Sequence, residues 1–258
     1  MELWLHYIKY TSEATSVVCG GKPELGLSCD YLLHGMLATA ASHLAYLKPD
    51  HRAKYNLLSR QHQDLALGPF QQAMESITEE NASFVFSYGI LLVVGSLSSS
   101  EIIPTQRGNE PSSRIADWVI CIRGCRSVCL VAKSDIGGFP INELQKLRET
   151  FAFTVQGFNA TLTVAMKIPS PNSVPQRMSN RLLLTLWPLT VTDAFVRLLS
   201  EMRPPALIIM AHYCLILRRG KDCWYMAESG LKIFQAIQHY LGEEWSAYVE
   251  YPRRVFGL

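Results

Sequence analysis

The chain has 258 residues, 48% of them hydrophobic and 18% charged, so it is long enough to bury a sizeable core. Its formal net charge of +2 gives no electrostatic argument for binding to nucleic acid or to a membrane, and we expect no nucleic-acid binding for this chain alone. No stretch has the length and apolar character of a membrane span, and the N-terminus lacks the basic start of a signal peptide.

The cysteines indicate a reducing compartment rather than a disulfide framework. There are seven, an odd number, and none are arranged as C-x-x-C. Cys121, Cys125 and Cys129 recur every four residues, which on a helix places three sulfurs along one face instead of around a metal ion. We therefore expect an intracellular protein, cytoplasmic or nuclear, without a bound metal.

Apolar residues that recur at steps of three and four predict helices through the N-terminal half. Asp30 and Asp50 are placed to cap two of them, and Gly68-Pro69 is expected to bend or break the third. The predicted helices cover residues 3–18, 31–47, 50–67, 70–77 and 84–97, and an irregular loop follows near 98–113.

The C-terminal half continues in the same way, with a second irregular loop near 169–175. Period-two alternation with hairpin turns is missing, and 151–168 is the one segment that would suit a pair of strands. Helices are predicted over residues 115–133, 142–153, 180–202, 204–217, 224–240 and 245–251. The fold class is therefore all-α, a single domain over 1–258 with about nine to eleven helices around an apolar cavity.

Residues 203–217 are the most informative segment. A proline pair opens an apolar run that is too short to cross a bilayer but long enough for a buried helix. Its one polar step, His212-Tyr213, would give an apolar pocket wall two polar groups, although core residues with ordinary hydrogen bonds explain the pattern equally well. The predicted ligand-binding residues are Phe86, Trp118, Arg123, Met210 and Trp224.

Motifs for nucleotide, dinucleotide or zinc binding are missing, as is the G-x-S-x-G nucleophile motif. If the protein is an enzyme, we expect it to need no cofactor and to use acid–base chemistry. Asp193 lies in an apolar stretch that would raise its pKa, although a solvated helix face is the simpler explanation. The candidate catalytic residues are His212, Tyr213, Asp193, His34 and His43.

Five blocks carry a family resemblance, and they begin at residues 1, 31, 60, 118 and 205. They read MELWLHY, YLLHGMLA followed by SHLA, RQHQDLALGPF, WVICIRGCR and PALIIMAHY. In this order they resemble M-E-L-L-H-H-(Phe/Trp), F-L-M-H-x-I-L-A-L-S-A-x-H-L-A, R-H-Q-x-x-A-L-x-x-F, W-(apolar)-x-L-L-R-G-V-R and G-P-A-L-I-I-L-A-H-(Trp/Tyr). These are segments of the C-terminal regulatory domain in fungal zinc-cluster transcription factors of the sterol uptake control type.

The resemblance implies an all-α domain that binds a sterol-like molecule in an apolar interior and controls a separate DNA-binding module. The zinc cluster itself has six closely spaced cysteines, and no part of this chain has that spacing. We therefore expect a domain that binds a sterol-, terpenoid- or polyketide-like molecule, here without the DNA-binding half.

Two other functions stay open. One is a cofactor-independent cyclase, isomerase or dehydratase of fungal secondary metabolism that uses the same pocket. The other is a protein-interaction module, and the sequence also leaves a homodimer open.

Overall fold

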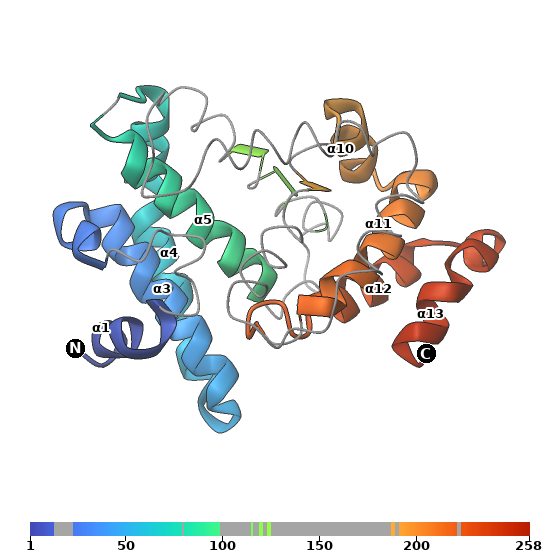
Figure 1. Ribbon diagram of the computed structural model, residues 1–258, viewed down its shortest axis with the longest axis horizontal. Helices are drawn as coiled ribbons and strands as arrows, with labels where there is room; N and C mark the ends of the chain where they lie inside the picture. Colours follow the sequence, from blue (N-terminus) through green and yellow to red (C-terminus); the bar gives the residue numbers. More distant parts are fainter. Residues whose placement is uncertain are drawn as a thin grey trace.

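The structure is a computed structural model, shown in Figure 1. It describes residues 1–12, 23–78, 80–98, 191–220 and 223–258, together with Ile115, Val119, Ile120, Arg123, Gly124, Trp187 and Pro188. The predicted loops near 98–113 and 169–175, the predicted helix over 142–153 and the segment 151–168 lie outside these residues. The extent of the single domain therefore stays a prediction.

The all-α prediction is confirmed. Eight α-helices and no strand lie in the described residues, against about nine to eleven helices predicted for the whole chain. They are α1 (Glu2–His6), α3 (Asp30–Leu47), α4 (Arg52–Glu75), α5 (Ala82–Ser98), α10 (Asp193–Ser200), α11 (Pro204–Leu217), α12 (Ser229–Tyr240) and α13 (Glu250–Phe256). Shorter π or 3-10 turns are η1 (Tyr7–Thr11), η2 (Pro23–Ser28), η3 (Pro49–His51), η6 (Arg218–Gly220) and η7 (Glu243–Val249).

The helices form two groups (Figure 1). The N-terminal helices α1, α3, α4 and α5 lie together, with α3 packed against both α4 and α5. The C-terminal helices α10 to α13 lie on the other side, where α11 packs against α12 and α13. The two groups meet where the end of α5 approaches α12.

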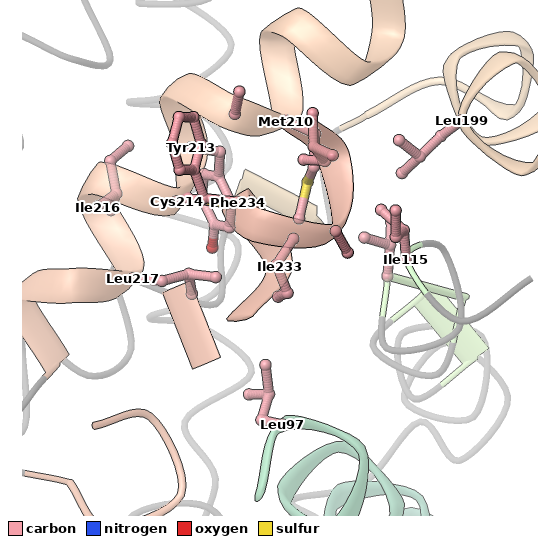
Figure 2. Close-up of a cluster of buried hydrophobic side chains, with 14 of the residues drawn as sticks. Leu97, Ile115, Leu199, Met210, Tyr213, Cys214, Ile216, Leu217, Ile233 and Phe234 are labelled. Atoms are coloured by element: carbon pink, nitrogen blue, oxygen red, sulfur yellow. The ribbon is translucent and has the colours of Figure 1, made fainter. Parts of the chain in front are cut away.

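The largest buried cluster joins these two groups (Figure 2). Val93, Val94 and Leu97 from α5 pack with residues of α10, α11 and α12. Fully burying one such side chain stabilises the fold by about 1.5–3 kcal/mol, so this cluster fixes α5 against the C-terminal helices. Its side chains on α11 and α12 include Leu207, Met210, Tyr213, Cys214, Leu217, Ile233, Phe234 and Ile237.

Two glycines allow helices to approach closely. A Cβ atom on Gly230 of α12 would lie 2.7 Å from the carbonyl oxygen of Cys214 on α11. A Cβ atom on Gly35 of α3 would lie 2.6 Å from the ring of Tyr88 on α5. The lack of a side chain at these positions therefore sets the spacing of α12 on α11 and of α5 on α3.

The proline-led helix was predicted correctly, because α11 runs from Pro204 to Leu217. The break at Gly68-Pro69 was wrong, since α4 continues through both residues to Glu75. A proline within a helix costs about 3 kcal/mol, and the packing of α4 on α3 offsets this.

Two helix starts also differ from the prediction. The helix expected over 180–202 is interrupted at residues 191–192, where the Thr192 hydroxyl accepts a hydrogen bond from the Phe195 amide and caps α10. The helix expected from Trp224 begins at Ser229, after a series of turns over 224–228. The predicted caps Asp30 and Asp50 are also wrong, because Cys29 and His51 occupy the N-cap positions of α3 and α4.

Candidate functional site

A cluster of aromatic rings around His43 lies between α3 and the turn that precedes α12. The His43 ring stacks on the Trp224 ring, with centroids 4.6 Å apart and planes 15° apart. The His6 ring of α1 lies 5.0 Å from the His43 ring, and the Nδ1 atom of His43 shares a 3.0 Å hydrogen bond with the Thr11 hydroxyl. We call His6, Thr11, His43 and Trp224 the His43 cluster.

A π-helical turn brings two members of the cluster together. In an α-helix, residues five apart such as His6 and Thr11 point about 140° away from each other. Here α1 passes directly into the π-helix η1, whose wider turn rotates Thr11 back toward the face that carries His6. Both side chains thereby reach the same histidine of α3.

The cluster contains two buried nitrogen atoms that form no hydrogen bond with any described residue. Thr11 is completely buried and His43 is 8% exposed. The Nε2 atom of His6 and the Nε1 atom of Trp224 are also buried, and neither has a partner in the part of the chain that the structure describes. A buried polar group without a partner costs roughly 1–3 kcal/mol, so both atoms favour a bound polar group.

The two histidines of the cluster are uncharged near neutral pH. Burial, with a smaller effect of His6, lowers the pKa of His43 from 6.5 to about 4. Burial also lowers the pKa of His6, and the nearby Lys48 ammonium acts in the same direction. Each neutral ring carries one donor and one acceptor nitrogen.

An exposed ion pair lies beside the cluster, between α1 and the end of α3. The Lys48 ammonium is 3.6 Å from the Glu2 carboxylate, which also accepts a 2.8 Å hydrogen bond from the Tyr55 hydroxyl. Because the two charges are opposite and close together, they cancel over longer distances. At His6 the effect of the Lys48 ammonium still exceeds that of the Glu2 carboxylate, which is why this pair helps to lower the pKa of His6.

His34 belongs to a separate pair of histidines. It lies nine residues before His43 on α3, which places it about 180° away, on the side that faces α4. Its Nδ1 atom is 2.9 Å from the Nδ1 atom of His62 on α4, so one ring donates the hydrogen bond and the other accepts it. Burial and the neighbouring His34 lower the pKa of His62.

Two of the three candidates on α11, Met210 and Tyr213, belong to the largest buried cluster. Met210 and Tyr213 are fully buried there, and the Tyr213 ring stacks on the Trp187 ring with centroids 4.4 Å apart. Burial raises the pKa of Tyr213 well above its usual value. The Nδ1 atom of His212 lies 2.9 Å from the carbonyl oxygen of Ile208 in its own helix. These residues contribute core packing and local hydrogen bonds.

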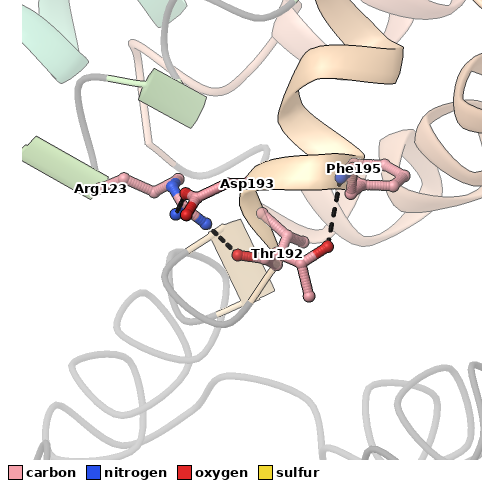
Figure 3. A network of polar contacts seen from close by, with 5 residues as sticks. Arg123, Thr192, Asp193 and Phe195 are labelled. Carbon is pink, nitrogen blue, oxygen red and sulfur yellow. Dashed lines mark hydrogen bonds and ion pairs between the residues drawn. The ribbon is translucent and has the colours of Figure 1, made fainter.

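Arg123 and Asp193 form an exposed ion pair, shown in Figure 3. The Arg123 guanidinium also donates a hydrogen bond to the Val191 carbonyl, so it holds the chain just before α10. The Asp193 side chain is 90% exposed. This exposure agrees with the solvated helix face, the simpler of the two explanations for Asp193, and the apolar environment considered as the other is not found.

The other candidate positions do not join these groups. Phe86 is buried with Ala82 and Val85 in a small cluster of α5, and Trp118 lies outside the described residues. No group of three or more side chains suited to hold a metal ion occurs in the described ranges. Within those same ranges, none of the helices has the length and apolar character to cross a membrane.

The structure thus brings together two residues that the sequence indicated separately, His43 and Trp224. Sequence reasoning missed His6, Thr11 and two tyrosines beside Trp224, Tyr225 and Tyr46, whose ring centroids lie 5.6 Å and 6.4 Å from the Trp224 ring. His6 and Thr11 lie next to the start of an apolar helix, but no sequence motif marks either of them as a site residue.

The comparison with protein families defines the class of the chain. The model described as the fungal specific transcription factor domain matches residues 23–162, which is more than half of the chain. The chain therefore belongs to the fungal specific transcription factor domain family. No curated protein matches the chain.

Proposed function

We propose that the chain is a regulatory domain that binds an uncharged, largely apolar small molecule of the sterol, terpenoid or polyketide kind at the His43 cluster. The family supports the regulatory part of this proposal. The observation that carries the binding part is the pair of buried nitrogen atoms on His6 and Trp224, which have no partner among the residues that the structure describes. The resemblance to regulators of the sterol uptake control type favours a sterol-like ligand.

The position of Trp224 supports a ligand with one polar end and a large apolar body. Trp224 touches His43 on one side and packs against the core cluster of α11 and α12 on the other. A molecule bound here would place its polar end at the His43 cluster and its apolar body against residues such as Met210. The predicted apolar cavity is part of this proposal.

Binding at this place would also explain regulation. The His43 cluster joins α1 and α3 to the turn before α12, so a ligand there contacts both groups of helices. A ligand that binds one arrangement of the two groups more tightly shifts the population toward that arrangement. In a transcription regulator, in the cytoplasm or nucleus, this shift between arrangements would be the signal that the ligand is bound.

No contact in the described part of the chain favours the alternative of a cofactor-independent cyclase, isomerase or dehydratase. DNA binding by these residues is not part of the proposal, and a homodimer stays a prediction.

Native mass spectrometry of protein purified from a fungal host tests the proposal. We expect a bound molecule that survives in the gas phase and is extracted by organic solvent. The Trp224→Ala variant should lose this molecule, because it removes the ring that stacks on His43 and packs against the largest buried cluster. The matched Trp245→Ala variant, which changes a tryptophan away from the cluster, should keep it. Folded wild-type protein that carries no such molecule, and takes up none of several sterols and terpenoids, would overturn the proposal.

A further inference from the structure

We infer that the ligand carries one uncharged oxygen that accepts a hydrogen bond from Nε1 of Trp224. The inference rests on the proposed function and adds the chemical class of the ligand's polar end. It starts from the two buried nitrogen atoms that have no partners among the described residues, on His6 and Trp224.

The ligand atom that contacts the Trp224 indole must be a hydrogen-bond acceptor. Nε1 of tryptophan is a donor only, so an amine or ammonium group on the ligand would leave it unsatisfied. Neutral His6 can present either a donor or an acceptor at Nε2. A hydroxyl oxygen supplies the acceptor that the indole needs, and the alcohols among the probes carry this group.

The uncharged histidines favour a neutral oxygen on the ligand. His6 and His43 are uncharged near neutral pH, and the adjacent ammonium of Lys48 is paired with Glu2. A carboxylate or phosphate would therefore be buried without a cation of its own, which costs more than an uncharged oxygen does. The site favours alcohols over acids that have the same apolar body.

Matched probes measure this preference directly. The full chain is tested by equilibrium dialysis with radiolabelled farnesol, farnesene and farnesoic acid, and with cholesterol and 5-cholestene. We expect the wild type to bind at least one alcohol about tenfold more tightly than its hydrocarbon, as one well-placed hydrogen bond in a buried site gives. Farnesoic acid should bind more weakly than farnesol.

Two tryptophan variants show whether Trp224 causes the preference for alcohols over hydrocarbons. Trp224→Phe keeps an aromatic ring beside His43 but removes the N–H group, so the preference for alcohols should fall to about twofold while the hydrocarbons still bind. Trp245→Phe is the control, because Nε1 of Trp245 already donates a 2.8 Å hydrogen bond to Glu244 at the surface. This control should keep the full preference.

Each outcome decides between the claims. Equal affinity of the wild type for alcohols and hydrocarbons would overturn the inference and leave the proposed function standing, as would an unchanged preference in folded Trp224→Phe. Failure of every probe to bind would overturn the inference, and together with the absence of a bound molecule in native mass spectrometry it would overturn the proposed function as well. If Trp224→Phe does not fold, the wild-type comparison of alcohol with hydrocarbon and acid still decides.

Discussion

Replacing Gly230 with alanine is expected to lower the free energy of unfolding by about 3 kcal/mol. The added Cβ would lie 2.7 Å from the Cys214 carbonyl oxygen and 3.2 Å from the Arg218 amide nitrogen. Both are backbone atoms of the neighbouring helix region, so no side-chain rotation relieves the contact. The first turn of α12 would have to move away from α11, which opens the largest buried cluster.

Urea unfolding of Gly230→Ala and of a matched variant, Gly95→Ala, measures this effect. Gly95 is also helical, but its added Cβ would meet only the end of the Gln63 side chain, at 3.3 Å, and that side chain can move. Alanine favours a helix by up to about 1 kcal/mol over glycine, so Gly95→Ala should be neutral or slightly stabilising. Equal effects of the two variants would contradict the close crossing of α11 and α12.

Lowering the pH from about 7.5 to about 4.5 is expected to remove about 2 kcal/mol of stability through His43. The pKa of His43 is about 4 in the folded protein and 6.5 is its ordinary value. Between these values the unfolded state binds more protons than the folded state, so stability falls as the pH falls. This contribution is complete above about pH 6.5 and is lost as the pH drops toward 4.

The variant His43→Gln should show a smaller loss of stability over the same pH range. Glutamine does not titrate, and its side chain can still share a hydrogen bond with Thr11. Part of the loss should remain, because burial also lowers the pKa of His6 and His62. His51→Gln is the control at an exposed position, and it should behave as the wild type. An unchanged pH dependence in His43→Gln would show that His43 is not buried as a neutral ring.

Helices with strong local signals were predictable from the sequence. The proline pair and the apolar run after it locate α11 to the residue, and the spacing of apolar residues locates α3 to within one residue. The errors arise where contacts between helices outweigh local preference. Pro69 remains within α4 because α3 packs along this helix. The helix α12 starts only at Ser229, where Gly230 lies close to α11.

The candidate site was predictable only in part. His43 and Trp224 were both among the candidates, but nothing in the sequence indicates that they touch, because they lie in segments far apart in the chain. Thr11 reaches His43 through a π-helical turn, and no residue pattern marks such a turn in advance. The ion pair of Arg123 with Asp193 was missed for the same reason, since it joins two distant segments.

The claim that a small molecule binds at the His43 cluster is tested most directly by NMR of the tryptophan indoles. The chain has five tryptophans, and the indole signal that is missing from Trp224→Phe identifies Trp224. On titration with farnesol or cholesterol, we expect this signal to move downfield, as a new hydrogen bond to Nε1 requires, and to move more than the signal of Trp245. A saturable shift at other indoles while the Trp224 signal stays unchanged would contradict binding at the His43 cluster.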